Sequence, residues 1–229
     1  MINKIIENKN KIMIAISLIA IGSIIRILFH SDLPAFKSAF ITINGVTQPM
    51  FILDLFFIVA IFSIISGLVL GGYYAFIVPI SIMIITDIAI GNNWILLFTW
   101  SGFAILGLVG FLLKSKRNLT YKNIPTFLGV GIVGILIYDL WTNFGTWLGG
   151  FGYAPNFTGL TQCYTMAIPF MLWHLLSTTI GLSIVLTTVI YIKEHRLKLP
   201  EVKETPFQNQ MTYAIPIVLV LLALLSVLV

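Results

Sequence analysis

Long apolar stretches dominate this chain and restrict what it can fold into. Seven of them follow one another, each close to the roughly 20 residues that an α-helix needs to cross the hydrocarbon core of a bilayer. They cover residues 12–29, 50–70, 73–90, 94–113, 124–148, 167–192 and 213–229. Only 9% of the 229 residues are charged, whereas roughly a quarter are charged in soluble domains. The sequence therefore predicts an all-α membrane protein.

The last apolar stretch stands apart from the other six. The segment before it is polar and contains Pro200 and Pro206, as linkers do. We expect a six-helix membrane core at residues 1–192, a cytoplasmic linker at 193–211 and an appended C-terminal transmembrane helix at 212–229. Segments 30–49 and 149–166 mix aromatic, glycine, proline and polar residues, which is typical of partly buried caps or re-entrant segments.

Basic residues in the predicted short loops indicate the orientation of the chain, because cytoplasmic loops carry an excess of Lys and Arg. Three clusters fall on one side if the N-terminus is cytoplasmic: Lys4, Lys9 and Lys11; Lys114, Lys116, Arg117 and Lys122; and Lys193, Arg196, Lys198 and Lys203. The opposite loops contain only Lys37. We therefore expect a multi-pass protein of the cell membrane with its N-terminus inside and its C-terminus outside. The net charge of +5 then reflects orientation in a lipid bilayer and not nucleic-acid binding.

Ionisable side chains inside the predicted spans are the strongest functional signal. Each costs about 2.5–3.5 kcal/mol at the centre of a membrane helix. They are Arg26, Asp54, Asp87, Asp139 and His174, with His30 just beyond the first span. Counting along each predicted helix places all of them in the outer half of the membrane, whereas a proton or ion pathway needs some in the inner half. This predicts a polar pocket that opens outward. The alternative is a set of buried ion pairs that only holds the helices together.

Aromatic and amide side chains accompany the ionisable ones at the same depth. Small-molecule sites combine an apolar and aromatic lining with a few placed polar groups. The predicted substrate-binding residues are Arg26, His30, Asp54, Asp87, Trp94, Asp139, Asn143, Trp147, Tyr164 and His174. The sequence contains no HExxH, CxxC, GxSxG or Walker motif, and we predict no metal site, no cofactor and no assigned catalytic residue.

A strip of small residues lies near the inner end of the second predicted span. Ser63, Gly67 and Gly71 recur every four positions, and such a strip lets another helix approach closely. We predict it as a partner-binding surface, on which a helix of another subunit would pack.

Three segments, residues 79–91, 141–148 and 159–170, carry a resemblance to a known group of proteins. The sequence resembles an uncharacterised bacterial and archaeal multi-span membrane family that is similar to the S-components of energy-coupling-factor (ECF) vitamin transporters. The likeness extends over about residues 26–188. It implies a six-helix module that binds a vitamin or related micronutrient in an outward-facing pocket. It also implies partners, namely a transmembrane coupling protein and two cytoplasmic ATPases.

The leading functional prediction is therefore a non-enzymatic, substrate-binding membrane subunit for micronutrient uptake. One alternative is a membrane-embedded enzyme that uses Asp139 and His174, with Cys163 as a candidate nucleophile. A second is a non-catalytic scaffold subunit. An enclosed, aromatic-lined outer cavity favours binding, and a filled bundle favours a scaffold. The enzyme needs Asp139 and His174 within one water-bridged hydrogen bond of each other.

Overall fold

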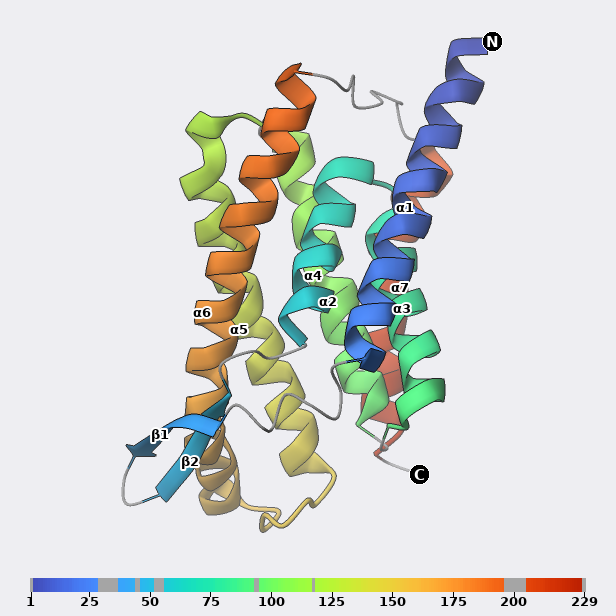
Figure 1. The fold of residues 1–229 in the computed structure, drawn as a ribbon. Coiled ribbons are helices and arrows are strands. Elements are labelled where there is room, and N and C mark those ends of the chain that lie inside the picture. The colour runs from blue at the N-terminus through green and yellow to red at the C-terminus, as the bar shows by residue number, and fades with distance from the viewer. Residues whose placement is uncertain are drawn as a thin grey trace.

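The computed structural model describes residues 2–28, 37–43, 46–51, 56–92, 95–116, 118–195 and 205–227. Its helices are α1 (Ile2–Leu28), α2 (Phe56–Ile65), α3 (Tyr74–Ile90), α4 (Leu96–Lys116), α5 (Ile124–Leu148), α6 (Phe157–His195) and α7 (Pro206–Leu225). A π-helical segment, η2 (Ser66–Leu70), continues α2, and a 3₁₀ turn, η3 (Tyr121–Asn123), precedes α5. The helices form one elongated bundle with the chain termini at its opposite ends (Figure 1).

All seven predicted helices are present. Five of them are long and apolar enough to cross a membrane: α1, α4, α5, α6 and α7. The other two are shorter apolar helices, formed by α2 with η2 and by α3. The described part of the chain thus has the architecture of a multi-pass α-helical membrane protein. The division into six core helices and one appended helix stays a prediction.

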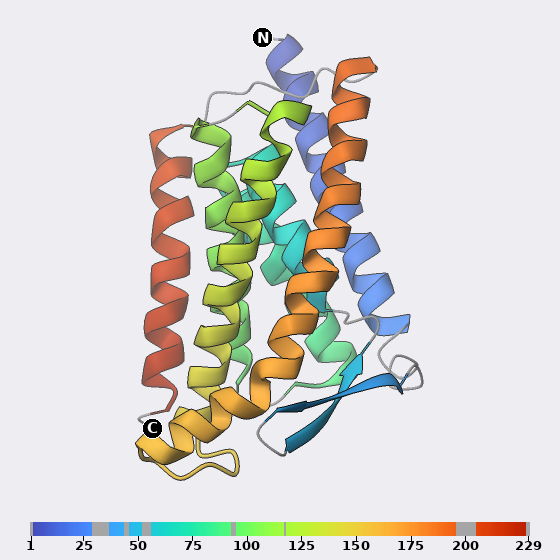
Figure 2. The same ribbon diagram turned by 90° about the vertical axis from the view of Figure 1, so that its left-hand side faces the viewer.

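Helix boundaries differ from the prediction at several places, first in α1 and α6. Helix α1 begins at Ile2, so the basic residues that the sequence assigns to a loop are helical. Helix α6 begins at Phe157 and takes up much of the segment that the sequence assigns to a cap. Pro169 lies inside α6, where it removes a backbone hydrogen bond and bends the helix. Figure 2 shows the lower part of α6 turning away from the direction of the rest.

A β-hairpin stands in the segment before α2, where the sequence predicts a cap or re-entrant piece. Strands β1 (Lys37–Ile43) and β2 (Val46–Phe51) pair antiparallel, with Lys37 opposite Phe51 and Ile43 opposite Val46. The β-branched and aromatic residues of both strands favour this conformation. The predicted start of the second helix at residue 50 is therefore wrong, because residues 50–51 belong to β2, and the short hairpin is an addition to an otherwise helical architecture.

Helix α4 packs closely against the α2–η2 segment through glycines. A Cβ atom on Gly67 would lie 2.0 Å from the carbonyl oxygen of Gly107, and one on Gly110 would lie 2.1 Å from that of Ile64. Ser63 and Gly67 are buried in this contact. The predicted partner strip is thus an internal helix contact of this chain and not an exposed surface.

A tight turn joins η2 to α3. Gly71 and Gly72 have positive φ angles of 70° and 52°, which glycine adopts without steric cost. The carbonyl oxygen of Leu70, at the end of η2, accepts hydrogen bonds from Nζ of Lys11 at 2.9 Å and from Nζ of Lys114 at 3.0 Å. Two cations at a helix C-terminus complement its partial negative charge and tie α1 and α4 to the turn.

Helix α7 packs along α4 in the described structure. Its first turn is capped by Thr205, whose hydroxyl accepts a hydrogen bond from the backbone N–H of Gln208, while the Gln208 side-chain oxygen accepts from the backbone N–H of Thr205, which makes a capping box. The Tyr213 ring meets the Phe111 ring edge-on at 5.8 Å. Helix α7 therefore begins at Pro206, inside the segment that the sequence predicts as linker.

Candidate functional site

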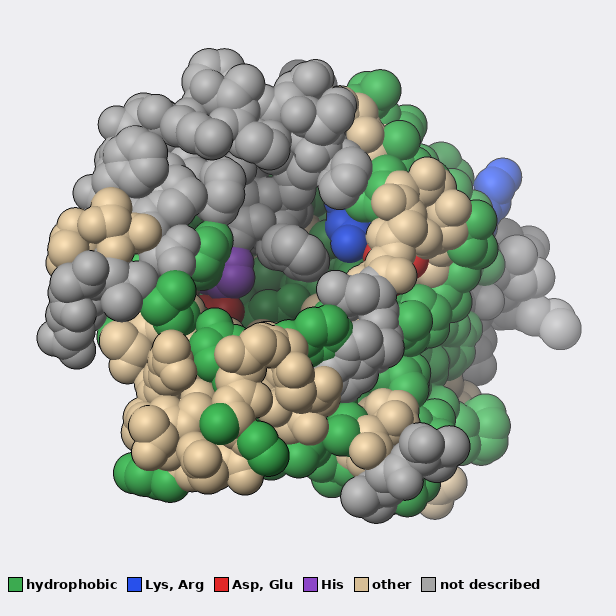
Figure 3. Space-filling view, turned by 90° about the horizontal axis from the view of Figure 1, so that it is seen from below, with side chains coloured by type: hydrophobic (Ala, Val, Ile, Leu, Met, Phe, Trp, Pro, Cys, Tyr) green, Lys and Arg blue, Asp and Glu red, His purple; other side chains and the backbone are tan. Residues whose placement is uncertain are grey.

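A cavity of about 460 Å³ opens at one end of the bundle, between the start of α4, the second half of α5 and the first half of α6. Most of its lining is apolar or aromatic, with a few polar groups. The lining residues are Ile95, Thr99, Tyr138, Asp139, Thr142, Asn143, Thr146, Tyr153, Cys163, Met166, Ala167, Phe170 and His174. Figure 3 views the molecule from this end and shows a hollow with a histidine and a carboxylate inside it.

Asp139 and His174 form the most polar part of this cavity. Nδ1 of His174 lies 2.5 Å from Oδ1 of Asp139. The Asp139 side chain is 1% exposed and that of His174 is 18% exposed. In a neutral imidazole this bond makes Nδ1 the donor and Nε2 the acceptor. The rings of Tyr138 and His174 also meet in a T-shaped arrangement, with centroids 6.5 Å apart.

One face of α5 supplies the polar wall of the cavity. Asp139, Thr142, Asn143 and Thr146 follow at spacings of three and four, which places them on one side of a helix. The Asn143 amide donates to the carbonyl of Asp139 at 2.8 Å, and the Thr146 hydroxyl donates to that of Thr142 at 3.0 Å. These bonds hold the side chains along the helix, while the Asn143 side-chain oxygen and the Thr146 hydroxyl oxygen keep their capacity to accept a hydrogen bond.

The loop between α5 and α6 forms part of the rim. Gly150 and Gly152 have positive φ angles of 73° and 76°, so the chain reverses there without strain. The Trp147 indole donates to the carbonyl of Ala154 at 3.0 Å and holds the loop to α5. This brings Tyr153 to the cavity, where burial, and to a lesser extent the nearby Cys163, raises the pKa of its hydroxyl. Tyr153 therefore stays protonated at neutral pH and can donate a hydrogen bond.

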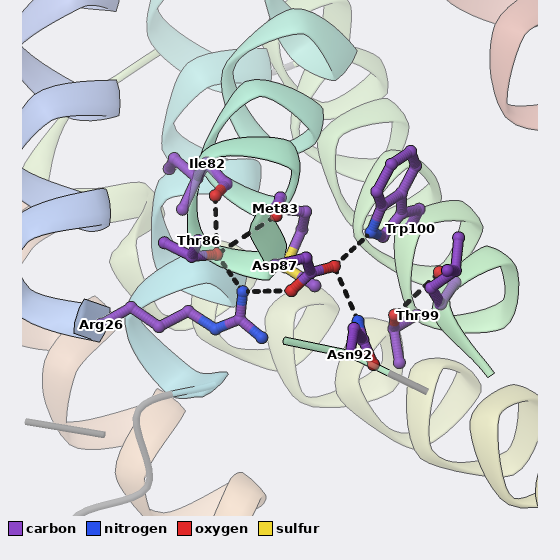
Figure 4. A network of polar contacts seen from close by, with 9 residues as sticks. Arg26, Ile82, Met83, Thr86, Asp87, Asn92, Thr99 and Trp100 are labelled. Atoms are coloured by element: carbon purple, nitrogen blue, oxygen red, sulfur yellow. Dashed lines mark hydrogen bonds and ion pairs between the residues drawn. The ribbon is translucent and has the colours of Figure 1, made fainter. Parts of the chain in front are cut away.

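A second polar cluster joins α1, α3 and α4 and lies outside the cavity lining (Figure 4). Nη1 of Arg26 lies 2.8 Å from Oδ1 of Asp87 and also contacts the Thr86 hydroxyl. Oδ2 of Asp87 accepts from the Trp100 indole at 2.8 Å and from the Asn92 amide at 2.6 Å. Both charged side chains are under a tenth exposed. For Arg26 and Asp87, this geometry matches the alternative prediction of a buried ion pair.

The predicted substrate-binding residues fall into three groups in the structure. Asp139, Asn143 and His174 line the cavity together. Arg26, Asp87, Trp147 and Tyr164 are absent from its described lining, and the Tyr164 hydroxyl instead donates to the carbonyl of Leu140 at 2.9 Å. His30, Asp54 and Trp94 lie outside the described residues.

Several lining residues are missing from the predicted set. Helical spacing from two predicted residues, Asp139 and His174, identifies four of them. Thr142 and Thr146 share a helix face with Asp139, and Phe170 and Met166 lie four and eight positions before His174. Tyr138 has no such signal, because it reaches the cavity from the flank of α5 where Phe103 of α4 packs against its ring.

The candidate nucleophile Cys163 lines the same cavity as Asp139 and His174 but is separated from His174 along α6. Cys163 precedes His174 by 11 positions in α6, which corresponds to roughly 16 Å along a helix. Its thiol contacts the carbonyl of Asn143 at 3.4 Å. In the described part of the chain, no group of three or more His, Cys, Asp or Glu side chains is placed to hold a metal ion.

Comparison with known proteins gives one match. No curated protein and no solved structure is significantly similar to the chain. A protein family matches residues 6–202, a range that begins inside α1, contains α2 to α6 and ends before α7. By this match, the chain belongs to the family of unknown function DUF6580.

Proposed function

We propose that this chain is a membrane substrate-binding subunit, similar to an ECF S-component, that captures a vitamin or related micronutrient from outside the cell. The observation that carries the proposal is the 460 Å³ cavity at one end of the bundle, lined by aromatic rings around a few polar groups. Small-molecule sites are commonly roughly 300–1,000 Å³ and have this kind of lining. The volume favours a compact ring compound over a corrinoid macrocycle.

The distribution of basic residues supports an outward-facing cavity. Lys9 and Lys11 lie near the start of α1, Lys116 ends α4, and Lys193 lies near the end of α6. These helix ends gather at the upper end of the bundle in Figure 1, opposite the cavity. Because cytoplasmic loops are rich in Lys and Arg, the cavity end faces outward and the N-terminus lies inside.

The family match supports a core of six helices with α7 appended to it. The matched range ends at residue 202, before α7 begins at Pro206. In this proposal, a transmembrane coupling protein and two cytoplasmic ATPases supply the energy for transport. Ser63 and Gly67 are buried against α4, so the coupling protein would contact another surface of the core.

The proposal is tested by mass spectrometry of a denatured extract of the purified, detergent-solubilised protein. We expect a small organic compound in stoichiometric amount, absent from an equally prepared membrane protein of similar size. A protein that is empty after expression in rich medium, and that binds no vitamin at micromolar concentration, would contradict the proposal.

The Asp139–His174 contact favours an enzyme as the second candidate. A carboxylate that orients an imidazole at 2.5 Å is the arrangement of a general base. The two functions predict different fates for the retained compound. A binding subunit returns it unchanged after incubation, whereas an enzyme converts it to a product of different mass, and His174→Gln abolishes the conversion.

A further inference from the structure

We propose that residues 150–168, which cover the loop after α5 and the part of α6 before Pro169, form a gate for the cavity. The gate moves as one piece about hinges at its two ends and opens the part of the cavity wall that it carries. This inference rests on the proposed binding function for what the gate admits. The movement itself is argued from the geometry of the segment and is tested without a ligand.

Both ends of the segment have the backbone features of a hinge. At its start, Gly150 and Gly152 have positive φ angles, and a Cβ atom on either would meet no atom within 4 Å. Glycine is therefore required there by the backbone conformation and not by packing. At the other end, Pro169 lies inside α6 and cannot donate the backbone hydrogen bond that would join the two parts of the helix. Figure 2 shows the bend that results.

The segment carries a part of the cavity wall. Tyr153 of the loop and Cys163 and Met166 of the first part of α6 line the cavity. His174 lines it from the other side of Pro169 along the chain. A rotation of the segment about Pro169 therefore separates two parts of the lining and changes the access to the cavity.

The loop and the first part of α6 are packed closely enough to move together. A Cβ atom on Gly159 would lie 2.0 Å from the carbonyl oxygen of Ala154. The Asn156 side-chain oxygen also accepts a hydrogen bond from the backbone N–H of Gly159 at 2.9 Å. Loop and helix are thus joined within the segment, and the freedom to move lies at its ends.

Small side chains form the buried face of the first part of α6. Gly159, Cys163 and Ala167 recur every four positions and are all buried, so they share one face of the helix. Thr161 and Gln162 lie outside this face and are exposed. Small side chains interlock little with a neighbouring helix, and opening the segment uncovers little apolar surface, which keeps the cost of the movement low.

Side-chain hydrogen bonds hold the segment against α5. The Trp147 indole donates to the carbonyl of Ala154 at 3.0 Å, and the Tyr164 hydroxyl donates to that of Leu140 at 2.9 Å. Both bonds are exposed, so water can replace either partner when the segment opens. Exposed hydrogen bonds and few buried apolar contacts are the properties of regions that open locally while the rest of a protein stays folded.

The test uses Cys163, the one cysteine of the chain, which is 2% exposed. The measurement is the rate at which N-ethylmaleimide labels it in the purified full-length protein, followed by intact-protein mass. Trp147→Phe removes one of the hydrogen bonds that hold the segment, and we expect labelling about fivefold faster. Trp100→Phe is the matched control, because it removes an indole hydrogen bond in the cluster around Asp87, and it should leave the rate unchanged.

Two results of this comparison overturn the gate. One is an unchanged rate in Trp147→Phe. The other is an equal increase in Trp147→Phe and Trp100→Phe, because labelling would then report unfolding of the whole protein. If Trp147→Phe does not fold, Tyr164→Phe makes the same test at the second hydrogen bond.

Hydrogen exchange followed by mass spectrometry locates the hinge. We expect the amides of residues 150–168 to exchange faster in Trp147→Phe than in the wild type, and those of α6 after Pro169 to be unaffected. Equal acceleration on both sides of Pro169 overturns the hinge. Failure of either test leaves the proposed binding function standing, whereas an empty cavity contradicts that function and leaves both tests of the gate valid.

Discussion

Nδ1 of His174 in α6 lies 2.5 Å from Oδ1 of Asp139 in α5, and the two helices pack side by side around this contact. The pair is buried on the aspartate side and faces the cavity on the imidazole side. The pair therefore contributes both to the stability of the bundle and to the chemistry of the cavity. Mutations of its two residues distinguish these two contributions.

Removal of His174 should destabilise the protein more than neutralisation of Asp139. His174→Ala leaves the buried carboxylate without its imidazole partner, and breaking a buried ion pair in this way costs about 3–5 kcal/mol. Asp139→Asn keeps an acceptor for Nδ1 and should cost less. The double variant should unfold at a higher temperature than the sum of the single effects predicts. Thermal unfolding in detergent measures this, and strictly additive effects would contradict a direct coupling.

Neutralisation of the second cluster should affect stability and not ligand binding. Arg26→Met leaves Asp87 buried beside Trp100 and Asn92 without its cation, at a cost of about 3–5 kcal/mol. Trp100→Phe removes one hydrogen bond from the same carboxylate and should cost about 1–3 kcal/mol. At matched amounts of folded protein, both variants should retain the ligand. Loss of ligand from folded Arg26→Met protein would contradict this prediction and would show that Arg26 contributes to ligand binding.

Close packing of α4 should make Gly107 intolerant of any side chain. A Cβ atom there would lie 1.7 Å from the carbonyl oxygen of Ala75, a backbone atom that moves only if α3 moves. Gly107→Ala should therefore lower the yield of folded protein sharply, by more than the typical overpacking cost of about 1–3 kcal/mol. Gly129→Ala is the matched control, because no atom lies within 4 Å of its added Cβ. Equal yields of the two variants would contradict the packing described for α4.

The sequence predicts the depth of a residue in the membrane better than the direction in which its side chain points from the helix. Counting residues along the spans places Asp139, Asn143 and His174 at one depth, and the structure brings all three into one cavity. Arg26 and Asp87 have a similar depth, yet they pair with each other 61 positions apart. Which neighbour a given helix face contacts depends on the packing of the whole bundle. The hydropathy of a single span does not carry this information.

The small-residue strip shows the same limit. At Gly67 the strip of Ser63, Gly67 and Gly71 lies in a close helix contact, but the spacing alone does not identify the partner. The partner is α4 of the same chain, whose Gly107 and Gly110 face the strip. The hairpin at β1 and β2 was not predictable from span length either, because its strands lie between two apolar helices and are too short to register as spans.

Membrane orientation is testable by cysteine labelling in whole cells. In a Cys163→Ser background, Thr161→Cys introduces a thiol at an exposed position near the cavity end, and Tyr121→Cys introduces one at the opposite end. A membrane-impermeant maleimide should label Thr161→Cys in intact cells and Tyr121→Cys only after permeabilisation. The reverse pattern would place the cavity on the cytoplasmic side and contradict capture from outside.

The most direct measurement is native mass spectrometry of the intact protein, wild type and Thr146→Trp. Thr146 lines the cavity, and a tryptophan at this position would occupy the volume that a ligand needs. Thr188→Trp is the control, because Thr188 is exposed and lies outside the described cavity lining. The binding account predicts one small-molecule adduct on the wild type and on Thr188→Trp, and a bare mass for folded Thr146→Trp. An adduct that persists on Thr146→Trp, or its absence from the wild type, would contradict the claim that this cavity binds the substrate.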